Sequence, residues 1–224
     1  MFPLRDDRPH FSPPVVTLVL IALNVLVFIF EMLLAPSTRN AFIATWGIIP
    51  DREYFRPLTL VTSMFLHGGW MHIISNMMFL WAFGRSLEDG MGRAKYLLFY
   101  MLCGVAAGLT QVFFNPDLRV PTVGASGAIA AVMGAYMITY PRAYIHTLIF
   151  IFVFVTTTDI PAVFILGYWF LTQLFNGVGT IGYSHVSQGG TAWFAHIGGF
   201  LAGIVAIKLL GIDDVNARRR RVTW

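Results

Sequence analysis

Apolar runs about as long as a lipid bilayer is thick constrain this chain more than any other feature. A helix needs about 20 consecutive apolar residues to cross the hydrocarbon core. The chain is 57% hydrophobic and 12% charged, whereas an ordinary soluble domain carries about 25% charged residues. Six segments fit a transmembrane helix: Val15–Leu34, Trp70–Leu87, Ala94–Phe114, Ser126–Tyr140, Ala162–Phe175 and Thr191–Leu210. The sequence therefore predicts an all-α membrane protein, built as a bundle of six transmembrane helices.

These spans divide the chain into three parts. Residues 1–14 precede the first span, residues 15–211 form the six-span domain, and residues 212–224 form a basic tail. The first apolar run is too long for a signal peptide and lacks a small-x-small cleavage site, so we expect it to remain as a span. The apolar stretch Tyr144–Val155 has 12 residues, too few to cross alone. It is interpreted as an interfacial segment, a re-entrant segment or a helix extension, with a seven-span count as the alternative.

Lysine and arginine are distributed unequally between alternate loops. With the N-terminus placed inside, the inner segments hold 11 of these residues and the outer segments hold 4. Cytoplasmic loops usually carry the excess, so both termini are predicted to lie in the cytoplasm. Because nearly all of these charges flank spans, they indicate topology and not a basic face for nucleic acid. In this topology His72, Ser126 and His196 lie at a similar shallow depth below the outer surface.

Ser126 opens the fourth span, directly after Gly124 and Ala125 and before Gly127. Glycines on both sides allow other backbone to approach closely. The first N–H groups of a helix lack acceptors within it, and together with the positive end of the helix dipole they can stabilise an oxyanion. A serine here can equally be a helix cap followed by small packing residues. This short segment alone does not separate the two interpretations.

His196 has apolar neighbours on both sides within the sixth span. A buried imidazole without a partner would be costly, so it needs a hydrogen bond, either to a serine hydroxyl or to a backbone carbonyl. Gly199 and Gly203 lie four residues apart on the same helix and allow a second helix to approach closely. That approach would bring Ser126 within reach of His196. Because no acidic residue is well placed to complete a triad, we predict a Ser–His dyad, the minimal machinery of nucleophilic catalysis.

His72 and Asn76 are four residues apart near the start of the second span and share one helix face. Both can donate hydrogen bonds to developing negative charge, as acyl transfer requires. His67 is expected to be structural and to pack the preceding loop onto this helix. A zinc site formed by His67, His72 and His196 would lack the His-Glu-x-x-His motif that supplies ligands and base together. We therefore predict no metal and no cofactor.

Together these residues resemble the rhomboid family of intramembrane serine proteases over about Val15–Leu210. The resemblance rests on three motifs in the second, fourth and sixth spans: His67-x4-His72-x3-Asn76, Gly124-Ala125-Ser126-Gly127 and Ala195-His196-x2-Gly199-x3-Gly203. It implies Ser126 as nucleophile and His196 as general base. It also implies three oxyanion donors: the side chains of His72 and Asn76 and the backbone N–H of Ser126.

The resemblance has further implications for the loops. The first loop would lie partly in the membrane, and the Gly-rich stretch of about Gly177–Gly190 would cap the site. The chain departs from many members in the first loop, where Tyr54-Phe55-Arg56-Pro57 stands in place of a Trp-Arg pair. The anchoring of that loop is therefore not predicted by the resemblance.

The function implied by the resemblance is cleavage of transmembrane helices in membrane-protein substrates near the outer face of the bilayer. A non-catalytic relative that binds and escorts transmembrane helices is the alternative. Such a relative is expected to lack Ser126 or His196, whereas this chain keeps both. A small-solute transporter would show inverted repeats and broken mid-bilayer helices, and no repeat is evident. The compact six-span form favours the bacterial plasma membrane, while the oligomeric state and the substrate are left open.

Overall fold

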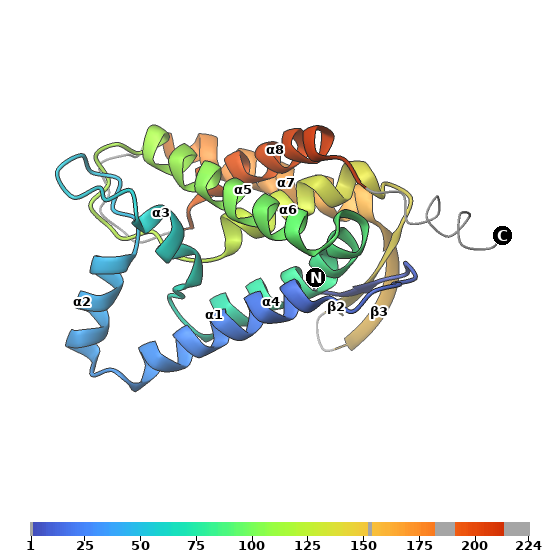
Figure 1. The fold of residues 1–224 in the computed structure, drawn as a ribbon, viewed down its shortest axis with the longest axis horizontal. Helices are drawn as coiled ribbons and strands as arrows, with labels where there is room; N and C mark the ends of the chain where they lie inside the picture. The colour runs from blue at the N-terminus through green and yellow to red at the C-terminus, as the bar shows by residue number, and fades with distance from the viewer. Residues whose placement is uncertain (1, 152–153, 182–190, 213–224) are drawn as a thin grey trace.

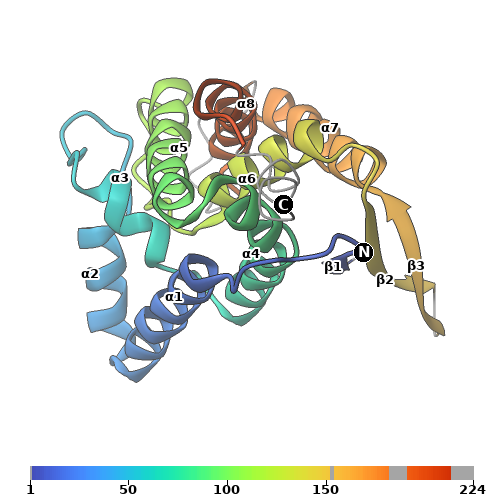
Figure 2. The ribbon, with the colours of Figure 1, turned by 45° about the vertical axis from the view of Figure 1, so that its right-hand side comes forward.

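Helix α6 (Ser126–Thr139) lies in the middle of a helical bundle (Figure 1, Figure 2). The computed structural model describes residues 2–151, 154–181 and 191–212. Every residue of α6 from Gly127 to Tyr136 is buried, so this helix is apolar on all sides, as a core helix must be. The helices packed around it are α4 (Trp70–Met91), α5 (Arg93–Phe114), α7 (Ala162–Ile181) and α8 (Trp193–Leu210).

Helix α1 (Val15–Leu33) packs against α4 at the side of the bundle. The long loop predicted after it contains helices α2 (Pro36–Trp46) and α3 (Thr59–Thr62) and the 3-10 turn η1 (Ser63–Phe65). Large apolar side chains stay exposed along α1, including Leu26 and Leu33. A surface of this kind is suited to lipid and would be a liability in water.

Four of the described helices are long and apolar enough to cross a membrane. They are α1, α5, the Ala162–Thr180 part of α7, and α8. Helix α4 is as long as α5, and the buried α6 is a shorter apolar helix. The helices agree with the predicted spans in position, while the count of six crossings and the placement of both termini in the cytoplasm stay predictions.

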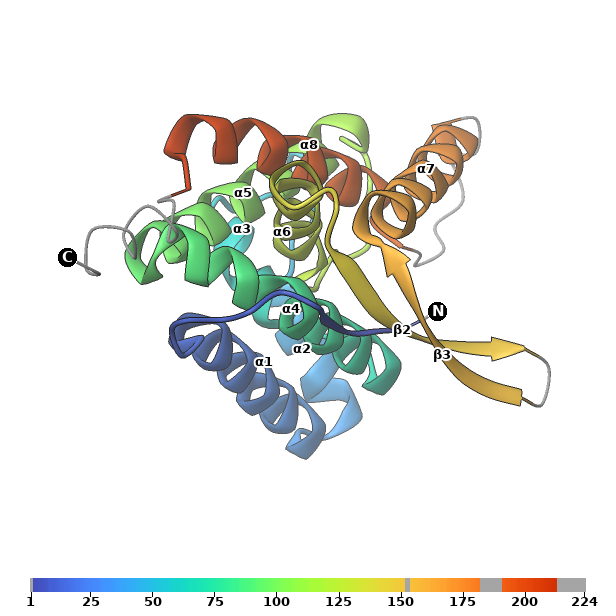
Figure 3. The same ribbon diagram turned by 90° about the vertical axis from the view of Figure 1, so that its right-hand side faces the viewer.

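The prediction of an all-α fold is wrong in one respect, because three strands form an antiparallel sheet in the order β1-β2-β3. The strands are β1 (Phe2–Asp6), β2 (Tyr144–Ile151) and β3 (Phe154–Pro161). Figure 3 shows β2 and β3 as a hairpin that projects beyond the helices. The stretch Tyr144–Val155 is therefore neither a seventh span nor a helix extension. Its aromatic and β-branched residues favour strands, and hydropathy alone does not show that preference.

Two buried acidic residues, one in the N-terminal segment and one on α4, hold the start of the chain against the helical core. Asp6 at the end of β1 accepts hydrogen bonds from Ser86 Oγ and from Tyr136 Oη, the latter at 2.8 Å. Glu88 near the end of α4 accepts the backbone N–H groups of Val16 and Thr17, both at 2.8 Å. Glu88 thus satisfies donors that the first turn of α1 leaves without intrahelical partners. Both anchors lie toward the end of α4 that is remote from His72.

Helix α7 is longer than the predicted fifth span, which was expected to end at Phe175. Residues Gly177 to Ile181, predicted to belong to the cap loop, continue this helix. The remainder of that predicted cap, residues 182–190, lies outside the described residues, as does the tail that contains Arg218 to Arg221.

Candidate active site

Ser126 occupies the first position of α6 and is half-buried. The residue before it, Ala125, is the N-cap, and no side chain makes a cap hydrogen bond. The capping role considered for Ser126 is therefore not the one it has in the structure. Its Oγ lies 2.8 Å from Nε2 of His196 on α8.

The close approach of α6 and α8 explains how residues 70 positions apart in sequence come into contact. A Cβ atom added at Gly199 would overlap the carbonyl group of Gly127, and one added at Gly203 would overlap that of Ala131. Gly134 on α6 faces the backbone of Phe200 in the same way. Because glycines face backbone in both directions, the two helices pack closer than any side chain would permit.

The His196 imidazole is enclosed on several sides, and the side chain is 8% exposed. Its Nδ1 lies 2.8 Å from Oε1 of Gln173 on α7. The rings of Trp169 and Trp193 flank it, with centroid separations of 5.6 Å and 6.3 Å. The sequence analysis did not identify Gln173. The sequence nevertheless indicates this residue, because a glutamine amide within an apolar span needs a hydrogen-bond partner.

A sharp turn at Gly124 places the segment before Ser126 against α4. Gly124 has φ of +126°, a conformation that favours glycine, and its N–H donates to the Ser63 carbonyl at 2.9 Å. A Cβ atom at Gly124 would lie 2.7 Å from Nε2 of His72 and 3.6 Å from Nδ2 of Asn76. These two side chains therefore lie beside the turn that leads into Ser126.

His67 is 1% exposed and connects the loop after α1 to α4. Its Nε2 lies 3.0 Å from Nδ2 of Asn76, and the amide must be the donor in that hydrogen bond. The His67 backbone N–H points at the buried Glu31 carboxylate on α1, with 3.3 Å between N and Oε2. The ring also makes an edge contact with His72, 5.1 Å between centroids. His67 therefore contacts both Glu31 of α1 and the Asn76 side chain of α4, while its structural role stays a prediction.

The first loop is anchored by charged and aromatic residues of its own. Arg119, between α5 and α6, donates from Nε to Asp51 Oδ2 at 2.9 Å. This hydrogen bond holds the pKa of the Asp51 carboxyl below its usual value. The same guanidinium lies 5.6 Å from the centre of the Tyr54 ring, within range of a cation–π contact. These contacts attach the first loop to the segment before α6.

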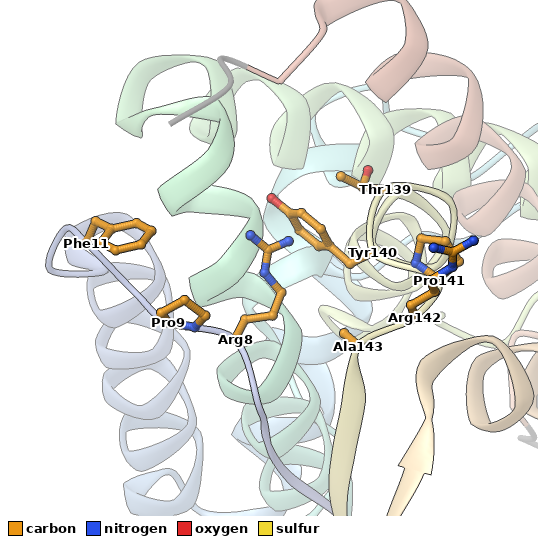
Figure 4. Close-up of a pocket in the computed structure, with 8 residues that line it drawn as sticks. All are labelled: Arg8, Pro9, Phe11, Thr139, Tyr140, Pro141, Arg142 and Ala143. Atoms are coloured by element: carbon orange, nitrogen blue, oxygen red, sulfur yellow. The ribbon is translucent and has the colours of Figure 1, made fainter. Parts of the chain in front are cut away.

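A separate cavity of about 600 Å³ opens at the other end of α6 (Figure 4). Arg8 lies over the Tyr140 ring there, 3.2 Å from its centre. The lining comes from the N-terminal segment and the end of α6: Arg8, Pro9, Phe11, Thr139, Tyr140, Pro141, Arg142 and Ala143. Since α6 begins at Ser126, the length of the helix, about 20 Å, separates this cavity from the Ser126–His196 pair. Within the described part of the chain, no three His, Cys, Asp or Glu residues group closely enough to hold a metal ion.

Apolar helices of membrane-spanning length pack around a buried helix, α6, and the serine at its start contacts a histidine on α8. This arrangement is that of a multi-pass membrane protein. The chain belongs to the rhomboid family, because the Rhomboid domain model matches residues 52–212. This match includes every residue of the site from His67 to Gly203. The chain is therefore an integral, multi-pass membrane protein.

Sequence comparison also finds relatives that are rhomboid proteins, at low sequence identity. The chain is 27% identical over 214 residues to the rhomboid protease GluP of Bacillus subtilis, covering 93% of this chain and 37% of GluP. It is 26% identical over 220 residues to the mitochondrial rhomboid protein 1 of Saccharomyces cerevisiae, covering 95% and 59%. It is also 26% identical to the rhomboid protease GlpG of Salmonella choleraesuis, covering 98% and 70%. The chain thus spans between a third and three fifths of the length of the first two relatives.

Proposed function

We propose that this chain is an intramembrane serine endopeptidase that cleaves transmembrane helices of membrane-protein substrates with a Ser126–His196 dyad. The observation that carries the proposal is the 2.8 Å separation of Ser126 Oγ and His196 Nε2. Rhomboid relatives that are named proteases support it. The bacterial plasma membrane is the location we propose, because the relatives GluP and GlpG come from bacteria.

In the proposed mechanism His196 Nε2 takes the hydroxyl proton while Ser126 Oγ attacks the carbonyl carbon of the scissile peptide bond. The tetrahedral intermediate collapses when the protonated imidazole donates its proton to the leaving amine. Water, deprotonated by His196, then hydrolyses the acyl-enzyme ester and restores the serine. The half-buried position of Ser126 is compatible with access for both water and substrate.

The oxyanion would be held at the start of α6. The backbone N–H of Ser126 has no acceptor within the helix and lies at the positive end of its dipole. His72 and Asn76 approach from α4 beside Gly124, so their side chains can add donors from a second direction. Each preorganised donor of this kind is typically worth about 100- to 1,000-fold in rate.

A substrate helix must unwind before it can react, because a regular helix uses its own carbonyl and N–H groups internally. We propose that it enters laterally between α4 and α7. Both of these helices pack against α6, but within the described residues they do not pack extensively against each other. A path between them would lead to Ser126 without separating α6 from α8.

Cleavage in a bilayer tests this proposal. We expect the purified chain, reconstituted in liposomes with single-span substrates, to cut them within or beside the span, and mass spectrometry would map the new termini. A soluble unfolded protein should be a poor substrate by comparison. If the folded chain cross-links to transmembrane helices and never cuts any of them, the non-catalytic, helix-binding alternative replaces the protease assignment.

A further inference from the structure

Gln173 is held in one orientation by its own amide group. Its Nε2 lies 3.1 Å from the Trp169 carbonyl oxygen and 3.0 Å from Thr172 Oγ1. A carbonyl oxygen can only accept, so the NH₂ end of the amide must face it. The Thr172 hydroxyl donates to the same carbonyl at 2.6 Å, which leaves its oxygen lone pairs available to the amide. The Oε1 end must therefore face His196.

This orientation decides which imidazole nitrogen carries the proton. Oε1 of Gln173 lies 2.8 Å from Nδ1 of His196 and can only accept. Nδ1 must then be the protonated nitrogen, and Nε2 is left with a lone pair directed at Ser126 Oγ, 2.8 Å away. That is the tautomer a general base needs in order to remove the serine proton.

We propose that Gln173 is a positioning residue that fixes the tautomer and ring orientation of His196. The inference rests on the proposed function for its catalytic meaning, although the tautomer itself can be measured without any turnover. Gln173 does the orienting part of what an acidic residue does in a catalytic triad. A neutral amide does so without placing a carboxylate among apolar helices, where an additional charge would be costly.

Gln111 on α5 provides a matched control. Like Gln173 it is 5% exposed, and its Oε1 accepts the backbone N–H of Ala195 at 3.2 Å. It therefore contacts the same helix, one residue before His196, without touching the imidazole. Replacing either glutamine by leucine removes one buried hydrogen bond to α8, and only Gln173→Leu removes the one to the histidine ring.

The decisive measurement is the ¹⁵N NMR signature of the His196 ring in protein labelled at its six histidines and held in lipid nanodiscs. The His196 signals would be assigned by their loss in His196→Ala. We expect a protonated Nδ1 and an unprotonated Nε2 in the wild type and in Gln111→Leu, and a shift toward the opposite tautomer in Gln173→Leu. A protonated Nε2 in the wild type, or an unchanged ring in Gln173→Leu, would overturn the inference.

Kinetics supply the second measurement. Gln173→Leu is expected to lower kcat about 10- to 100-fold with little change in KM, since a general base as a whole contributes about 100- to 10,000-fold. Gln111→Leu should change kcat per folded molecule by less than about 3-fold. An equal loss of kcat in both variants would show that Gln173 contributes only to packing, and would contradict a positioning role. Failure of the wild type to cleave anything would contradict the proposed function, and the tautomer measurement would still decide the role of Gln173.

Discussion

Replacement of Ser126 by alanine should lower the rate of transmembrane-substrate cleavage by about three orders of magnitude or more, and His196→Ala should lower it nearly as far. The double variant should be no worse than Ser126→Ala alone. Nucleophile and base act as one unit, so removal of either already removes the proton transfer that the 2.8 Å contact makes possible. The measurement is the initial rate of cleavage in proteoliposomes, normalised to folded protein.

Controls for this prediction come from residues of the same type outside the site. Ser37 is exposed on α2, and His146 lies on β2 and pairs with Asp159 at 2.8 Å. Ser37→Ala and His146→Ala should cleave at close to the wild-type rate. Thermal unfolding of each site variant would establish that the fold is intact. Turnover by Ser126→Ala at more than a few per cent of the wild-type rate would contradict the assignment of Ser126 as the nucleophile.

Addition of a single methyl group at Gly199 should cost both stability and activity. In Gly199→Ala the new Cβ would overlap the Gly127 carbonyl, so α6 and α8 must separate. Overpacking of this kind typically costs about 1–3 kcal/mol. Because Gly127 follows Ser126 directly and Gly199 lies one turn after His196, the separation also moves the two reacting groups apart. A misplacement of about 1 Å can cost about 100-fold in rate.

Gly167 on α7 supplies the comparison, because a Cβ atom there would meet nothing within 4 Å. Gly167→Ala should keep wild-type activity, with a melting temperature that is equal or slightly higher, since alanine is the better helix former. Melting temperature and cleavage rate would be measured for both variants under the same lipid conditions. If Gly199→Ala matches Gly167→Ala in both quantities, close packing of α6 on α8 does not hold the site together.

The parts of the structure that follow from local sequence pattern were predictable. Apolar runs indicated where α1, α5 and α8 lie. Ser126 was expected to be the first residue of a helix, and α6 begins at that residue. The pair of glycines at Gly199 and Gly203 predicted a close helix approach, and they face the backbone of α6. Each of these features depends on side-chain size or hydropathy within one segment.

The parts that depend on pairing between distant segments were missed. The sheet joins residues near the start of the chain to Tyr144–Ile151, and hydropathy does not reveal strand partners. Asp6 and Glu88 are buried because hydrogen-bond donors from other helices surround them. Gln173 meets His196 because α7 packs against α8, a contact between separate helices that spacing along the chain does not encode.

The central claim is that Ser126 is a nucleophile activated by His196, and covalent labelling tests it before any substrate is known. The folded chain in lipid would be treated with a fluorophosphonate, and the modified peptide would be mapped by mass spectrometry. We expect one adduct, on Ser126 Oγ, that disappears in both Ser126→Ala and His196→Ala. An adduct at another residue, or none in a folded wild type, would contradict the account.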